Sequence, residues 1–172
     1  ITIVTGVQTC ALPISLSELH HMIMHEEKDF KKEEILLLII EQLIAEYDHA
    51  GAALTTQPPN TEIKAVCDFL ENNYMKSITL NDLSDLTGIS KYYLLRSFTK
   101  QKGISPYCYL ETIRIGNAKK LLEQQIAPID VALQTGFTDQ SHFTNFFKKL
   151  IGLTPKQYMN IFTEGSRRSG NE

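Results

Sequence analysis

Apolar residues recur three and four positions apart over most of this chain, which is the period of an amphipathic helix. Residues 32–47 show the pattern most clearly, with acidic side chains and Gln42 on the opposite face. A shorter stretch of the same kind covers residues 16–25. A short pair of helices cannot hide so wide an apolar stripe from water by itself. The stripe therefore needs a partner, which is either the rest of a domain or a second copy of the chain.

Two segments lack this period. Residues 50–60 combine small residues with Gly51 and the pair Pro58-Pro59, and we interpret them as a linker. Residues 1–15 start with a β-branched run that could form an edge strand, but residues 6–15 follow neither period. We expect a non-native or unstructured segment there, similar to translated adapter sequence, and a natural N-terminus that is missing.

After the linker, capping residues, glycines and prolines bound each periodic segment. The pattern predicts helices over residues 61–74, 80–87, 90–102, 106–124, 128–135, 139–151 and 154–162, with Thr61 as the first N-cap and a disordered tail at 163–172. The 106–124 helix would be about 28 Å long at ~1.5 Å per residue. The fold class predicted is all-α, with residues 16–49 forming a short helical pair ahead of the linker.

An internal repeat is the most informative feature. Gly103-Ile104-Ser105-Pro106-x-x-Tyr109 matches Gly152-Leu153-Thr154-Pro155-x-x-Tyr158 at an offset of 49, and Thr87-Gly88 matches Thr135-Gly136 at 48. In each copy a short helix ends at Thr-Gly, an apolar residue follows, and a longer helix carries a phenylalanine for the core. This pattern is typical of a helix-turn-helix unit.

The geometry of such a unit explains the pattern. A glycine in the turn permits a positive φ, so the chain can reverse sharply and set the second helix across the first. Ile89 and Phe137, which follow the two glycines, would hold the turns to the core, and Phe98 and Phe147 would anchor the second helices. One face of each second helix then remains available for a groove about 12 Å wide.

The residues expected on these faces suit nucleic acid. Arg can bind guanine, and Asn or Gln can bind adenine, whereas Lys and helix N-termini suit phosphates. An exposed arginine usually makes no specific contact. Because Arg96 lies within this repeat, we nevertheless expect its side chain to contact DNA. The candidate base contacts are Tyr92, Leu95, Arg96, Gln140, Ser141, Thr144 and Asn145. The candidate phosphate contacts are Ser90, Lys91, Lys100, Asp139 and Lys148.

The distribution of charge agrees with this assignment. Residues 1–59 carry 3 basic and 9 acidic side chains, whereas residues 60–162 carry 12 and 9. The second segment is therefore the better candidate for contact with a polyanion. Its excess of positive charge is small, so the placement of the charges matters more than their number.

Other chemistries find little support. Cys10, Cys67 and Cys108 lie far apart with no C-x-x-C pair, which disfavours a disulfide framework and fits a reducing cytoplasm. His21 and His25 could share a zinc ion, but a metal-dependent sensor would need further ligands, and a surface histidine cluster is favoured. We therefore expect no metal and no cofactor.

Neither an enzyme nor a membrane protein is indicated. No Ser-His-Asp set, phosphate loop or carboxylate pair stands in a recognisable context. The longest apolar run, residues 35–40, is too short to span a bilayer. A helical adaptor that binds protein remains the alternative class, since a fold does not determine a function. The candidate faces are polar rather than aliphatic, which argues against the adaptor.

Residues 60–162 resemble the two-unit DNA-binding domain of the AraC/XylS family of bacterial regulators. The resemblance rests on Gly136-Phe137-x-Asp139-Gln140-Ser141-x-Phe143-x-x-x-Phe147-Lys148-Lys149-x-x-Gly152-x-Thr154-Pro155-x-x-Tyr158. It implies that helices 90–102 and 139–151 are recognition helices joined by the 106–124 spacer. The family often has Arg in the second recognition helix, whereas this chain has Asn145. This difference affects how strongly, and at which bases, the second recognition helix would bind its half of the DNA site.

The resemblance also implies partners. It predicts a cytoplasmic transcription regulator, for example an activator, that reads two successive major grooves of double-stranded DNA and contacts RNA polymerase. Residues 16–49 would be the end of an effector-sensing and dimerising domain. A homodimer would then form through residues 32–48, with contacts from Leu36, Ile40, Leu43 and Tyr47.

Overall fold

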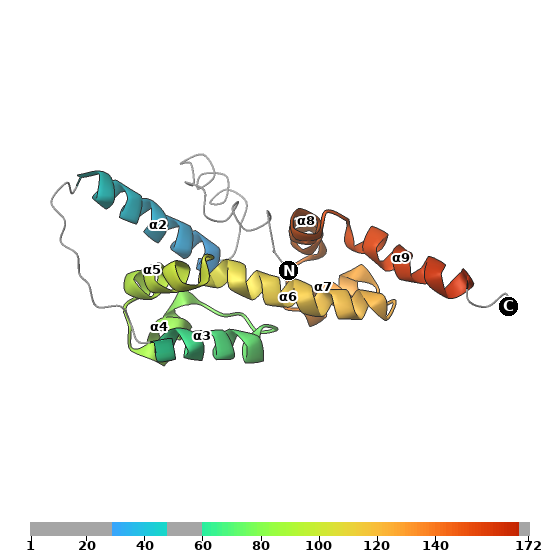
Figure 1. Cartoon of the computed structure of the whole chain (residues 1–172), viewed down its shortest axis with the longest axis horizontal. Coiled ribbons are helices and arrows are strands. Elements are labelled where there is room, and N and C mark those ends of the chain that lie inside the picture. The colour runs from blue at the N-terminus through green and yellow to red at the C-terminus, as the bar shows by residue number, and fades with distance from the viewer. Residues whose placement is uncertain (1–28, 48–59, 169–172) are drawn as a thin grey trace. The chain divides into compact units, whose positions relative to one another are not determined.

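The computed structural model describes residues 29–47 and 60–168, and the regular elements in this part of the chain are all helices (Figure 1). The all-α prediction is confirmed. The helices are α2 (Asp29–Tyr47), α3 (Asn60–Asn73), α4 (Leu80–Thr87), α5 (Lys91–Lys102), α6 (Pro106–Glu123), α7 (Pro128–Gln134), α8 (Gln140–Ile151) and α9 (Pro155–Arg168).

The chain divides into two compact units, and the boundary falls inside α6. Unit 1 comprises Ile1–Asn72 and Ile78–Tyr109, so its described part holds α2 to α5 and the start of α6. Unit 2 comprises Asn73–Ser77 and Leu110–Glu172, which includes the rest of α6 and α7 to α9. Each unit contains one predicted helix-turn-helix pair.

Local sequence explains the helix ends in unit 1. The hydroxyl of Thr79 accepts a hydrogen bond from the amide of Asp82, whose carboxylate accepts one from the amide of Thr79, and together they form a capping box at α4. Gly88 and Gly103 end α4 and α5 in the left-handed conformation that glycine adopts without steric cost. The interior of unit 1 is filled by Ile63, Val66, Leu70, Ile78, Leu80, Leu83, Leu94 and Phe98.

Helix α2 packs on the rest of unit 1. Phe30 is 3% exposed, and its ring meets that of Tyr107 edge to face with the centroids 5.6 Å apart. Ile35 and Glu34 are also buried, whereas Leu36 and Ile40 are exposed. One face of α2 is therefore covered by unit 1 and another remains open.

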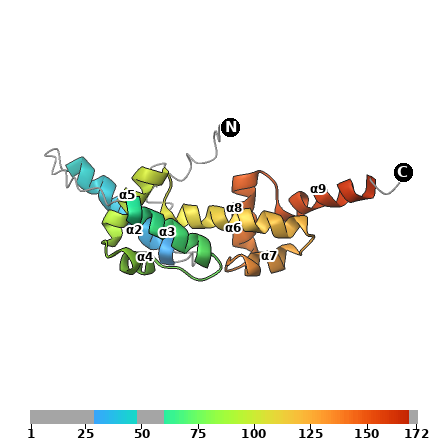
Figure 2. The same ribbon diagram turned by 60° about the horizontal axis from the view of Figure 1, so that its bottom comes forward.

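Unit 2 has a core of its own. Figure 1 and Figure 2 both show α7 and α8 beside the second half of α6. Ile115, Ala118 and Leu122 of α6 form the core with Val131, Ala132, Phe137, Phe143 and Phe147. Tyr158 and Met159 attach α9 to this core.

Two predicted boundaries need correction. Helix α3 already begins at Asn60, one residue earlier than predicted, and Thr61 lies inside the helix. Helix α9 continues to Arg168, which contradicts a disordered tail from residue 163. No proline follows Phe162, so nothing in the backbone stops the ladder of hydrogen bonds there. Residues 1–28, with the predicted 16–25 helix and His20, His21 and His25, lie outside the described part, as do the linker residues 48–59.

Candidate nucleic-acid interface

Both units contain the turn that the repeat predicts. Gly88 has φ of 68° and Gly136 has φ of 82°, so each turn uses the left-handed conformation. The threonine before each glycine is held in the same way. Thr87 Oγ1 donates to the carbonyl of Leu83 at 2.9 Å, and Thr135 Oγ1 donates to the carbonyl of Val131 at 2.7 Å. The two turns therefore share the threonine hydrogen bond and the left-handed glycine, although their backbone hydrogen bonds differ: Gly88 donates to the carbonyl of Ser84 and Gly136 to that of Leu133.

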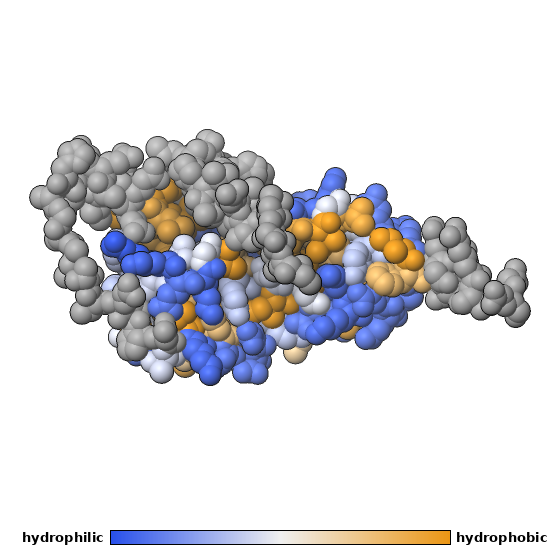
Figure 3. All heavy atoms as spheres, viewed as in Figure 1, coloured by the Kyte–Doolittle hydropathy of each residue, from blue (hydrophilic) through white to orange (hydrophobic). Residues whose placement is uncertain are grey.

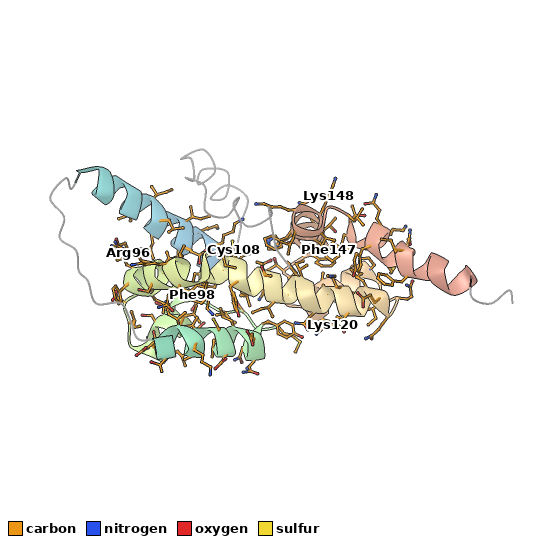
Figure 4. The ribbon with its side chains drawn as sticks, in the orientation of Figure 1. Arg96, Phe98, Cys108, Lys120, Phe147 and Lys148 are labelled. Carbon is orange, nitrogen blue, oxygen red and sulfur yellow. The ribbon has the colours of Figure 1, made fainter. Side chains whose placement is uncertain are left out.

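Helix α5 presents part of the expected face. Arg96 and Lys100 are exposed, and Tyr92 is half-buried. Phe98 points into unit 1, as Figure 4 shows, and is fully buried. The helix thus has one face in the core and a basic face at the surface.

The prediction that Leu95 contacts a base is wrong for this structure. We expected it on the exposed face, yet only 2% of it is exposed. It lies one turn after Lys91 and one turn before Thr99, whose hydroxyl oxygen is also buried. This edge of α5 is covered, so Leu95 is not available to a base edge in this structure.

The predicted phosphate contacts at the start of α5 have different environments. Ser90 is exposed at the N-cap position, but its side chain makes no capping hydrogen bond. Lys91 is half-buried and forms an ion pair with Glu33 of α2. Sequence reasoning missed this pair because the two residues are 58 positions apart.

Helix α8 presents the second face. Gln140, Ser141, Asn145 and Lys148 are exposed, and Thr144 is half-buried. Phe143 and Phe147 are fully buried on the opposite side. In Figure 4, Phe147 points toward α6 and Lys148 points away from it. The predicted division of α8 into a core face and a polar face is confirmed.

Asp139 has another role than the one expected. Its carboxylate accepts a hydrogen bond from the amide of His142 at 2.7 Å and caps α8. An anionic side chain also repels phosphate. We therefore correct the prediction that Asp139 contacts phosphate, and we retain it as the residue that sets the start of α8.

A shallow hollow of about 400 Å³ adjoins this face. Its walls are formed by Pro128, Gln140, Thr144, Thr154, Pro155, Lys156 and Met159. Lys156, exposed near the N-terminus of α9, therefore lies close to two candidate base contacts. The only feature of the sequence that could have pointed to Lys156 as part of the interface was its position two residues after Thr154 in the repeat.

Apolar surface lies elsewhere. Figure 3 shows hydrophobic side chains at the surface of α2, and others over α8 and the beginning of α9. The exposed members are Leu36 and Ile40 on α2, and Leu150, Ile161 and Phe162 on α8 and α9. For Leu43 and Tyr47, the structure describes the backbone alone.

Residues 29–47 and 60–168 contain no group of three or more His, Cys, Asp or Glu side chains placed to hold a metal ion. Among the helices that the structure describes, none is long and apolar enough to cross a membrane.

Comparison with known proteins agrees with the two-unit arrangement. Residues 83–161 match a family model described as a helix-turn-helix domain. The chain is 57% identical over 131 residues to the uncharacterized HTH-type transcriptional regulator YbfI of Bacillus subtilis, covering 76% of this chain and 48% of that protein. The chain thus spans about half the length of this relative.

Two crystal structures share the fold. One is the C-terminal domain of the two-component response regulator YesN from Fusobacterium nucleatum, with 33% identity and a TM-score of 0.55, covering 58% of this chain and 99% of that one. The other is a probable AraC family transcriptional regulator from Rhodopseudomonas palustris, with 26% identity and a TM-score of 0.57, covering 60% of this chain and 98% of that one.

Proposed function

This chain belongs to the AraC family of helix-turn-helix transcription regulators, and from that premise we propose that α5 and α8 are recognition helices that bind double-stranded DNA in a sequence-specific manner. The observation that carries the proposal is the matched construction of the two units. Each turn has a left-handed glycine, and each second helix has a buried phenylalanine and an exposed polar face.

The two faces suit different tasks. Arg96 and Lys100 on α5 bring positive charge, which fits guanine and phosphate. Gln140 and Asn145 on α8 are neutral, which fits adenine, and Lys148 adds a charge for the backbone. We therefore propose that α5 supplies more of the affinity and α8 mainly supplies sequence preference.

The reach of α6 supports contact with two grooves. Its 18 residues span about 27 Å at ~1.5 Å per residue, which is close to the ~34 Å of one duplex turn. One chain would then read two successive major grooves without a dimer.

The test begins with selection of duplexes from a random pool by the purified full chain, followed by sequencing. We expect a recurrent site with two half-sites about one helical turn apart. Affinity for that site is then measured by fluorescence anisotropy at several salt concentrations. Equal affinity for the selected and scrambled duplexes would contradict sequence-specific binding.

Unit 2 offers a matched pair of charge variants. Lys148 and Lys120 are both exposed, and Figure 4 shows them pointing to opposite sides of this unit. Lys148→Ala should weaken binding to all duplexes alike and lower the salt slope by about one. Lys120→Ala removes the same charge and should leave both quantities unchanged. Equal changes in affinity and salt slope for the two variants would show that Lys148 makes no specific contact with phosphate.

We also propose partners beyond DNA. The exposed Leu36 and Ile40 support a homodimer through α2. We propose, with family membership as support, that the chain contacts RNA polymerase, activates transcription and acts in the bacterial cytoplasm. A transcription assay with purified polymerase on a promoter that carries the selected site, with and without this chain, tests the polymerase contact and its sign.

A further inference from the structure

Helix α2 contacts unit 1 through two adjacent carboxylates. Glu33 pairs with Lys91 in the first turn of α5. Glu34, also on α2, is 3% exposed, and its carboxylate contacts the start of α6. Its Oε2 accepts a hydrogen bond from Ser105 Oγ at 2.6 Å, and its Oε1 accepts one from the amide of Tyr107 at 3.0 Å. These contacts are specific because a buried carboxylate is satisfied only by donors placed to meet both oxygens.

The second repeat shows what Glu34 replaces. At the start of α9, Gln157 Oε1 accepts from Thr154 Oγ1 and from the amide of Thr154, both at 2.9 Å, so that helix caps itself. The corresponding position at the start of α6 is Cys108, which has no carbonyl oxygen to offer. Glu34, from a helix some 70 residues earlier, accepts from the hydroxyl of Ser105 as Gln157 does from that of Thr154, and its second bond comes from the amide of Tyr107 instead.

The Glu33–Lys91 pair engages one edge of α5. Lys91, Leu95 and Thr99 follow one another at single-turn spacing, and all three are buried or half-buried. Of these three residues, Lys91 and Leu95 were expected to meet DNA.

We propose that α2 is an intramolecular cover of the first recognition helix. It occupies Lys91 with Glu33 and caps α6 with Glu34, so unit 1 engages DNA fully only after α2 has left. The proposal rests on the proposed DNA-binding function. Physically, Glu33 competes with phosphate for one cation, and two carboxylates at this edge repel a polyanion.

DNA binding then requires a conformer that is only partly populated, the one in which α2 is displaced. When only a fraction of molecules has α2 displaced, the apparent dissociation constant exceeds the intrinsic one by the inverse of that fraction. Loosening α2 should therefore raise the affinity for DNA even when no DNA-contacting residue is changed.

Three substitutions in the full chain test the cover. Glu33→Gln should raise the affinity about two- to fivefold, the range expected for one partly exposed ion pair. Glu34→Gln should raise it on the order of tenfold, because the hydrogen bonds to a buried carboxylate are lost or weakened. Cys108→Gln gives α6 its own cap, as Gln157 does for α9, and should raise the affinity without any change in charge.

Matched controls separate the cover from general effects. Asp68 is exposed on α3, so Asp68→Asn changes the net charge as much as Glu33→Gln does but touches no α2 contact. Cys108→Ser removes the thiol without the reach to cap Ser105. Both controls should leave the affinity unchanged. A rise with Asp68→Asn equal to that with Glu33→Gln would attribute the gain to net charge and overturn the proposal.

Hydrogen exchange supplies a second readout. On addition of the selected duplex, amides of residues 29–40 and of Tyr107 should exchange faster, while those of α5 should exchange more slowly. Slower exchange in residues 29–40 would mean that α2 stays docked on DNA, and the cover would be wrong.

Failure of DNA binding itself looks different. In that case no variant binds any duplex, but Glu34→Gln still speeds exchange at Tyr107 in the absence of DNA.

Discussion

The guanidinium of Arg114 donates to Glu111 Oε1 at 3.0 Å, and these two side chains are 1% and 0% exposed. Arg114 also donates to the carbonyls of Tyr74 at 2.8 Å and Lys76 at 3.0 Å. One buried cation on α6 therefore fixes the segment that follows α3, within unit 2. A buried carboxylate and two carbonyls depend on it.

Replacement of Arg114 should be among the most damaging changes in unit 2. Arg114→Met leaves Glu111 buried without its counterion, and we expect a loss of about 3–5 kcal/mol in the free energy of unfolding. Arg114→Lys keeps the charge but cannot reach all three acceptors, so we expect a smaller loss. Denaturation by guanidinium chloride measures both. A loss below 1 kcal/mol for Arg114→Met would contradict the anchoring role.

Gly136 and Gly152 form a matched pair for the turn. Both have positive φ, at 82° and 86°. A Cβ on Gly136 would lie 2.8 Å from the carbonyl oxygens of Tyr74 and Met75, whereas a Cβ on Gly152 would meet nothing within 4 Å. Gly152→Ala should therefore cost only the backbone strain of about 1–2 kcal/mol. Gly136→Ala should cost about 1–3 kcal/mol more, because backbone must move. Equal losses of stability in the two variants would show that the backbone at Tyr74 and Met75 can move away from the added Cβ without cost.

Local features of this fold could be predicted because a few adjacent residues determine them. The capping box of Thr79 and Asp82 and the glycines that end α4, α5 and α8 need no distant partner. The polar face of α8 could also be predicted, since the spacing of Phe143 and Phe147 places it opposite the core.

The errors have distant causes. Leu95 lies on the same edge of α5 as Lys91, whose partner Glu33 belongs to a helix more than fifty residues earlier. The carboxylates of Glu33 and Glu34 looked like part of a solvated acidic face, because helical periodicity says nothing about partners in another segment. The one sequence signal was Cys108 standing where the second repeat has Gln157.

The pH dependence of unit 2 should report Tyr158. Burial, and then its 2.8 Å hydrogen bond to Glu123, raises the pKa of this phenol from 10.0 to about 12. The folded state therefore favours the protonated form. This contribution to stability is fully present below pH 10.0 and is lost as the pH rises toward about 12.

Comparison with Tyr158→Phe isolates that contribution, since the two proteins differ only in this hydroxyl group. At pH 8 the variant should be less stable by about 1 kcal/mol, the usual worth of one hydrogen bond. The difference should shrink between pH 10 and 12. A difference that does not change with pH over this range would contradict the raised pKa.

Arg96 should determine part of the sequence preference. Arg96→Ala should cost about 1–3 kcal/mol at the selected site and relax the preference at one or two base pairs. Arg96→Lys keeps the charge without the planar fork, so it should retain more affinity while losing the same preference. Repeating the selection with each variant provides the measurement. An unchanged site for Arg96→Ala would remove it from the set of base contacts.

Self-association should depend on the open face of α2. At 100° per residue, Leu36, Ile40, Leu43 and Tyr47 fall within about 60° of one another, opposite Phe30 and Glu34. Leu36 and Ile40 are 47% and 39% exposed. Burial at ~25 cal/mol per Å² makes even a few hundred Å² outweigh repulsion between acidic surfaces. The double variant Leu36→Gln/Ile40→Gln should therefore sediment as a monomer at tens of micromolar, a concentration at which we expect the unchanged chain to sediment as a dimer.

The matched control removes the same kind of surface elsewhere. Ile129 and Leu133 on α7 are 54% and 64% exposed, so Ile129→Gln/Leu133→Gln deletes as much apolar surface without touching α2. This control should remain a dimer. Binding of the Leu36/Ile40 double variant to a single site should persist, since both recognition helices belong to one chain, but cooperative binding to paired sites should be lost. An unchanged chain that sediments as a monomer would instead assign the stripe to the wall of another domain.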